Sequence, residues 1–85
     1  MHASIQPKRF KGSYFRAADR TLFTYDVRVD PTVGGSAWFA TVRVDGDLRG
    51  RTNGVLTHPA FLDPSLEATI RELVEAAIRD RIGVG

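Results

Sequence analysis

The first two thirds of the chain alternate between apolar and polar positions with a period of two, which is typical of strands that bury one face. Four segments follow this pattern, at 10–16, 21–30, 36–44 and 48–56, and turn-forming residues separate them. Short connections of this kind join antiparallel neighbours. We therefore expect a β-meander, with residues 1–7 as a flexible N-terminal arm and residues 8–85 as a single small α+β domain.

The last quarter changes to the period of a helix, with apolar residues three and four positions apart. Asp63 is suited to the N-cap, Pro64 to the first helical position and Gly83 to the end of the helix. The apolar stripe consists of Leu66, Ile70, Leu73, Val74, Ala77, Ile78 and Ile82. Glu67–Arg71 and Glu75–Arg79 are spaced as ion pairs at i,i+4.

One apolar stripe requires one apolar sheet face. The predicted fold class is therefore α+β, a four-stranded antiparallel β-meander followed by one C-terminal α-helix packed on one sheet face (β-β-β-β-α). Alternation assigns the residues that lie under the helix. These are Phe23, Tyr25, Val27 and Val29 in one strand, and Trp38, Ala40, Val42 and Val44 in the next.

The segment VRVDGDLRGRTNG (42–54) contains a register problem. A two-residue loop at 45–46 or 46–47 would place Arg49 and Arg51 on the face of Trp38, where burying unpaired guanidinium groups is costly. We therefore predict a three-residue loop, 44–46, with Gly46 in the left-handed conformation. The predicted cross-strand pairs are Arg43–Asp47, Thr41–Arg49 and Phe39–Arg51, while Leu48, Gly50, Thr52 and Gly54 turn inward and the glycines make room for Trp38.

For the first hairpin, the sequence predicts a loop at 17–20 without a register problem. It pairs Tyr14 with Phe23 and Phe10 with Val27 on the inner face, and Phe15 with Leu22 and Lys11 with Asp26 on the outer face. The outer face then gathers apolar side chains among arginines, including Arg9. The candidate interaction residues are Phe15, Leu22, Arg28, Phe39, Arg43, Arg49 and Arg51.

The composition excludes several kinds of site and segment. The chain has 85 residues and no cysteine, which excludes disulfides and thiolate metal sites. The net charge of +2 divides into +4 over residues 1–20, 0 over 21–61 and −2 over 62–85, which is too mild an excess to indicate nucleic acid by itself.

No apolar run approaches the roughly 20 residues of a membrane span, and the N-terminus lacks the apolar region of a secretory signal. We expect a cytoplasmic protein without a membrane partner, and ten arginines against two lysines fit a GC-rich bacterial genome.

No catalytic constellation is visible. His2 and His58 have no second ligand or nucleophile beside them in the sequence, and the serines at 13, 36 and 65 have no recognisable base. The glycines of residues 34–36 precede a strand instead of a helix, so they do not form a phosphate site. We expect no enzyme activity, no cofactor and no metal.

Three interpretations of the outer face stay open. Its arginines can simply protect sheet edges, or the face can bind a protein partner or a second copy as a homodimer. Nucleic acid is the less favoured alternative, because Asp26, Asp30, Asp45 and Asp47 are interleaved with the basic residues and would repel phosphate.

Two segments resemble the HicB-like antitoxin domain. GGSAWFATV (34–42) is similar to its glycine-led aromatic strand, and SLEATIRELVEAAI (65–78) to its alanine-rich helix. The acidic, proline-containing connection that usually follows that strand is replaced here by a full hairpin. The resemblance implies partner binding in preference to catalysis.

Overall fold

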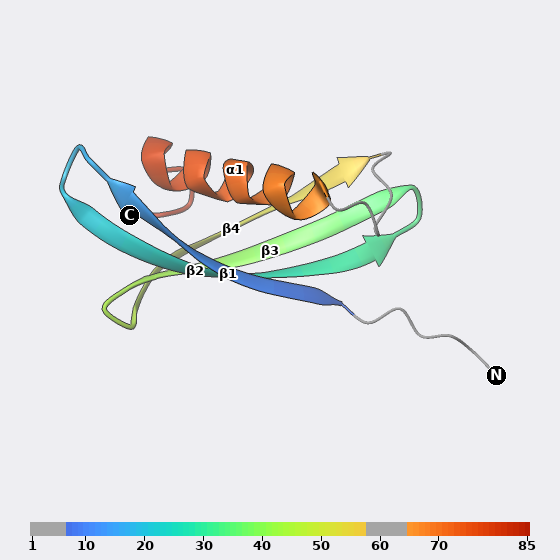
Figure 1. The fold of residues 1–85 in the computed structure, drawn as a ribbon, viewed down its shortest axis with the longest axis horizontal. Coiled ribbons are helices and arrows are strands. Elements are labelled where there is room, and N and C mark those ends of the chain that lie inside the picture. The colour runs from blue at the N-terminus through green and yellow to red at the C-terminus, as the bar shows by residue number, and fades with distance from the viewer. Residues whose placement is uncertain (1–6, 58–64) are drawn as a thin grey trace.

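The computed structural model describes residues 7–57 and 65–85. They form one antiparallel sheet in the order β1-β2-β3-β4, followed by a helix that lies across one sheet face (Figure 1). The elements are β1 (Lys8–Arg16), β2 (Thr21–Thr32), β3 (Gly35–Val44), β4 (Asp47–Thr57) and α1 (Ser65–Asp80). The expected β-β-β-β-α fold is confirmed, whereas the N-terminal arm lies almost wholly outside the described residues.

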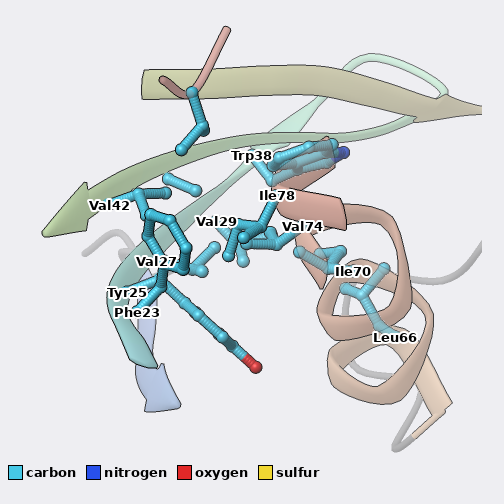
Figure 2. Packing of buried hydrophobic residues seen from close by; sticks show 12 residues of the cluster. Phe23, Tyr25, Val27, Val29, Trp38, Val42, Leu66, Ile70, Val74 and Ile78 are labelled. Carbon is cyan, nitrogen blue, oxygen red and sulfur yellow. The ribbon is translucent and has the colours of Figure 1, made fainter. Parts of the chain in front are cut away.

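The core lies between α1 and the inner faces of β2 and β3 (Figure 2). Trp38 is 4% exposed and packs on the helix side of the sheet, as alternation predicted. Burying each large side chain of this kind contributes about 1.5–3 kcal/mol, so the cluster supplies most of the driving force for folding. Its members are Phe23, Tyr25, Val27, Val29, Trp38, Ala40, Val42, Leu66, Ile70, Val74, Ile78 and Val84.

The helix ends at Asp80, three residues before the predicted glycine. Arg81 takes the left-handed position (φ 58°), and the amide of Ile82 donates to the carbonyl oxygen of Ala77 at 2.9 Å, which caps the last turn. Gly83 also has positive φ (74°) and turns the chain back toward β4. The predicted cap at Asp63 and Pro64 lies outside the described residues.

The predicted stripe of α1 was too wide, since Leu73 and Ile82 are exposed. The pair Glu67–Arg71 is confirmed at 2.9 Å. The pair Glu75–Arg79 is not formed, because Glu75 accepts a hydrogen bond from Tyr25 and Arg79 instead contacts Asp80.

The first hairpin has the predicted register. Tyr14 pairs with Phe23, Phe10 with Val27, Phe15 with Leu22 and Lys11 with Asp26.

The third hairpin differs from the prediction. Its loop is a two-residue Asp45-Gly46 turn, with both residues at positive φ (51° and 86°), and a bulge in β4 follows it. The register shifts between Val42 and Arg43, and Arg49 is the extra residue on the bulged strand. The turn matches the twist of the strands, and the bulge then restores the parity that the two-residue loop would otherwise violate.

The bulge changes the predicted pairs. Arg43 faces Leu48, Thr41 faces Arg51 and Phe39 faces Asn53, so Leu48 turns outward and the three predicted pairs are wrong. Three predictions are confirmed. Gly50, Thr52 and Gly54 lie on the inner face, Gly46 has positive φ, and Trp38 is buried opposite Gly54. A Cβ at Gly54 would lie 2.8 Å from the indole Nε1, so the glycine leaves the space that this ring occupies.

Candidate functional site

The sheet face turned away from α1, called the open face below, is uncovered in the described part of the chain (Figure 1). The registers place the same side chains on it from each strand. They are Arg9, Lys11, Ser13 and Phe15 from β1; Leu22, Thr24, Asp26, Arg28 and Asp30 from β2; Ala37, Phe39, Thr41 and Arg43 from β3; and Leu48, Arg51, Asn53, Val55 and Thr57 from β4.

Six of the seven predicted interaction residues lie on this face, and Arg49 does not. Because Arg49 occupies the bulge, it sits opposite Val42 together with Gly50 and turns to the helix side. Its guanidinium carbon lies 5.9 Å from the ring centre of Phe23, a fully buried core residue. The placement of Arg49 on the outer face was therefore wrong, whereas Arg51 lies there as expected.

The apolar residues of the open face do not form one cluster. Phe15 and Leu22 face each other at one end and are each more than half exposed. Phe39 pairs with Arg28, six residues further along β2, which corresponds to about 20 Å. Its nearer neighbours are Ala37 on the same strand and Val55 on β4, and the offset between β3 and β4 that brings Val55 there is invisible in the sequence.

A hollow of about 460 Å³ lies at the centre of this face. Its lining combines four basic side chains, one acidic one, one hydroxyl and one exposed aromatic ring, with two core residues beneath. The lining residues are Arg9, Lys11, Arg28, Arg43, Asp26, Thr41, Phe39, Phe10 and Val27.

The acidic groups of the open face are already engaged. Asp26 contacts Arg43 at 3.1 Å and Lys11 at 3.8 Å, and Asp30 contacts Arg28 at 3.3 Å. The two carboxylates interleaved among the basic residues of this face therefore serve as counter-ions to these bases. They reduce the positive charge of the hollow but do not cancel it.

Two arginines face each other across β1 and β2. Arg9 is directly opposite Arg28, and like charges in this position are destabilising. In the described residues Arg9 has no carboxylate partner, and neither has Arg51. The open face holds five basic and two acidic side chains, an excess of three positive charges (5 − 2), which is larger than the net charge of the whole chain.

The ring of Phe39 is the aromatic part of the hollow. It is 43% exposed, and the guanidinium carbon of Arg28 lies 4.9 Å from its centre. This contact holds the Arg28 side chain against the sheet. Less side-chain conformational entropy of Arg28 is therefore lost when an anion binds.

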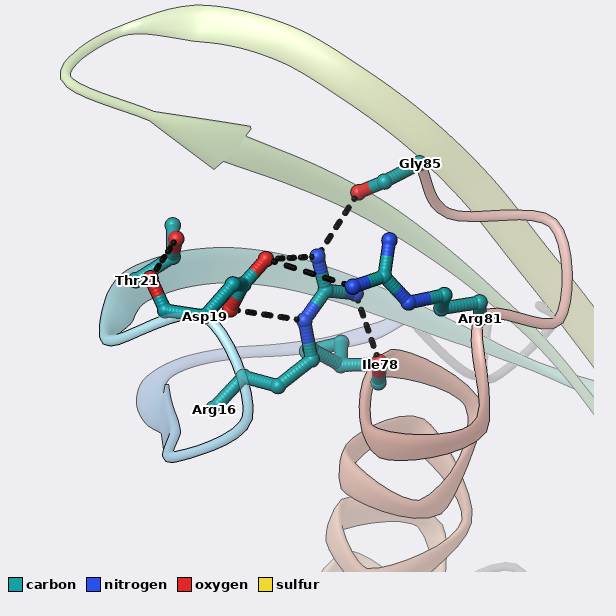
Figure 3. Close-up of polar contacts among 6 residues, drawn as sticks. All are labelled: Arg16, Asp19, Thr21, Ile78, Arg81 and Gly85. Carbon is teal, nitrogen blue, oxygen red and sulfur yellow. Dashed lines mark hydrogen bonds and ion pairs between the residues drawn. The ribbon is translucent and has the colours of Figure 1, made fainter.

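A second polar cluster, which the sequence analysis did not predict, lies at the C-terminal end of α1 (Figure 3). Arg16 is 2% exposed and donates to Asp19, to the carbonyl oxygen of Ile78 and to that of Gly85. Its hydrogen bonds lower the pKa of Asp19 to about 2. Because this guanidinium is enclosed by its own chain, the cluster holds the fold together and offers no room for a ligand.

Tyr25 forms a third polar contact beneath the helix. Its hydroxyl donates to Glu75 at 2.5 Å and accepts from Arg71 at 3.2 Å. Burial, followed by the hydrogen bond to Glu75, raises the pKa of Tyr25 to about 12. Arg71 also donates to the carbonyl oxygen of Lys11, so this network ties α1 to β1 and β2.

Residues 7–57 and 65–85 contain no group of three or more metal-ligating side chains, and no helix there is long and apolar enough to cross a membrane. Ser36 is fully buried, and its hydroxyl has no hydrogen-bond partner within the described part of the chain. His2 and His58 lie outside the described residues.

Comparisons with the models of protein families, with curated proteins and with solved structures find no match for the chain. None of them supports the resemblance to the HicB-like antitoxin domain.

Proposed function

We propose that the protein is a non-enzymatic binding module that docks an acidic segment of a partner protein on its open face. The observation that carries this proposal is the hollow around Arg9, Arg28 and Phe39, where positive charge exceeds the available carboxylates. A bound carboxylate would relieve the repulsion between the two opposed arginines. Arginine and exposed aromatic residues are also the side chains most enriched at protein interfaces.

Face-to-face contact between two copies is less well supported. It would bring two surfaces with an excess of positive charge together, and their apolar residues are divided between Phe15 and Leu22 at one end of the face and Phe39 nearer its middle. Such a contact gains little apolar burial to offset the repulsion. An acidic partner has complementary charge and avoids this cost.

Single-stranded nucleic acid is the second candidate. The observation in its favour is the contact between Arg28 and Phe39, since both side chains stack on bases. Against it, Asp26 stands inside the hollow and Phe39 is its only exposed aromatic ring among the described lining residues.

The experiment is fluorescence anisotropy at low salt with two probes, a labelled peptide of alternating glutamate and leucine and a labelled single-stranded oligonucleotide. We expect the peptide to bind and Arg9→Glu to weaken it about tenfold or more, because one charge-assisted contact is replaced by repulsion. Arg79→Glu on the exposed side of α1 is the matched control and should change binding less than about twofold.

Salt titration separates the two partners. Nucleic acid binding loses affinity steeply, with a slope near the number of phosphates neutralised. Preference for the oligonucleotide, with a steep slope and the same Arg9→Glu defect, would replace the acidic protein by nucleic acid. No binding of either probe at low salt would refute a binding role for this face.

A further inference from the structure

The outer edge of β4 already accepts an added strand. After the helix, residues 83–85 return to this edge and pair with it, through a bridge between Val84 and Gly50. The amide of Arg51 donates to the carbonyl oxygen of Gly83 at 3.2 Å, and the amide of Gly85 donates to that of Arg49 at 3.1 Å. The tail thus pairs with β4 through one isolated bridge and occupies only the first half of the edge.

The second half of the edge continues beyond the tail. Because the amide of Arg51 points outward, so do the backbone groups of every second residue after it, Asn53, Val55 and Thr57. In residues 7–57 and 65–85, nothing forms a hydrogen bond with these outward groups. Val55 is 65% exposed, and its side chain lies on the open face.

The two edges of the sheet are protected differently. The strand β1 carries Lys8, Arg9 and Lys11, and charges of this kind discourage pairing with another sheet. Residues 52–57 read TNGVLT and contain no charge and no proline. The usual protection is therefore missing at the one stretch of β4 that the tail leaves open.

We propose that two copies of the chain join through this stretch, as antiparallel β4 strands related by a two-fold axis at Val55. Such an axis stands perpendicular to the sheet, so the open faces of both copies lie on the same side. Each pair across the junction therefore joins two residues of the same face. This gives the pairs Val55–Val55 and Asn53–Thr57 on the open face. All the paired side chains are uncharged. The pairing ends before Arg51, because the amide of Arg51 already donates to the carbonyl oxygen of Gly83 in the tail.

The resulting sheet has eight strands from two meanders, with the two tails flanking the junction. Both hollows then lie on one continuous basic face, with the two copies of Val55 between them. The contact is independent of the proposed partner binding, since none of the hollow's lining residues takes part in it.

The test measures self-association of the full chain by sedimentation between about 10 μM and 1 mM, a range suited to a small interface. We expect the average mass to rise from monomer toward dimer with concentration. Val55→Lys places two ammonium groups opposite each other and should weaken association about tenfold or more. Leu48→Lys adds the same charge to the same strand at another exposed position, outside the paired stretch, and should stay within about twofold.

Hydrogen exchange of backbone amides identifies which residues form the dimer contact. The amides of Asn53, Val55 and Thr57 should exchange more slowly as wild-type concentration rises, and circular dichroism verifies that both lysine variants are folded. A monomer throughout the concentration range would overturn the proposal. So would a dimer that Val55→Lys leaves intact, or one that forms without slowing these three amides.

Discussion

Arg16 provides the most demanding test of how this fold is held together. The guanidinium group is almost fully enclosed and lies 4.5 Å from the centre of the Phe23 ring. It donates to Asp19 at 3.1 and 2.6 Å, to the carbonyl oxygen of Ile78 at 3.0 Å and to that of Gly85 at 3.3 Å. One side chain of β1 therefore joins the first turn, the end of the helix and the C-terminal tail.

Replacing Arg16 with methionine keeps an apolar side chain of similar length over Phe23 and removes every donor. The carbonyl oxygen of Ile78 then keeps only the long contact from the amide of Arg81 at 3.4 Å, and the loss of its charged donor costs about 1–3 kcal/mol. Asp19 loses its closer counter-ion but keeps Arg81 at 3.6 Å and is partly exposed, so part of that loss is recovered. We expect Arg16→Met to lower the free energy of unfolding by about 3–5 kcal/mol, a large share of the roughly 5–15 kcal/mol of a small domain.

Urea denaturation followed by circular dichroism measures this difference. Arg16→Lys keeps the charge but cannot reach the same acceptors with one ammonium group, so its loss should be smaller, about 1–3 kcal/mol. Arg79→Met removes an exposed arginine from the same end of the helix and should change stability by less than about 0.5 kcal/mol. If Arg16→Met were as stable as wild type, the desolvation of the guanidinium would offset all its contacts and the reasoning would fail.

Three further predictions concern the core, the third hairpin and acid stability. Trp38→Ala should cost about 3–5 kcal/mol in urea denaturation, because a nearly fully buried indole is lost, and a cost below 1 kcal/mol would contradict its place in the core. Gly46→Val should cost about 1 kcal/mol or more because of its positive φ, whereas Arg51→Ala on the open face should cost less than about 0.5 kcal/mol. The pKa of Asp19 is lowered from 3.8 to about 2, so its contribution is present above pH 4 and lost as the pH falls toward 2. Thermal unfolding of Asp19→Asn should therefore depend less on pH across that window than wild type, and parallel curves would exclude Asp19 as the titrating group.

The sequence was sufficient for the fold and for most of the core, because periods of two and 3.6 residues assign faces without knowledge of the partners. It was insufficient for the third hairpin. One extra residue between Val42 and Arg51 is needed to place their side chains on opposite faces of the sheet. A three-residue loop and a two-residue loop followed by a bulge both supply this residue. The strong Asp-Gly turn preference decided between them, and it moved Arg49 to the other face.

The burial of Arg16 was also beyond the reach of local patterns. An arginine at the end of a strand usually points to solvent, and its partners Ile78 and Gly85 lie 62 and 69 residues away in the chain. The candidate site was predicted as a face and not as a hollow, and of the seven chosen residues only Arg28, Phe39 and Arg43 line the hollow. Its shape depends on how β2 is offset against β3, and six of the seven chosen residues do lie on that face.

The position of the tail bears on how this chain folds during synthesis. Residues 83–85 complete both the pairing of β4 and the hydrogen bonds of Arg16, so these contacts join the first strand to a segment made after the helix. Residues 58–85, which include the helix, take about 1–6 s to translate, at roughly 5–20 residues per second. During that interval the meander has no helix over its apolar face, and a nascent chain at this stage is a substrate for chaperones and proteases. A stalled or truncated product that ends inside α1 would keep that face exposed.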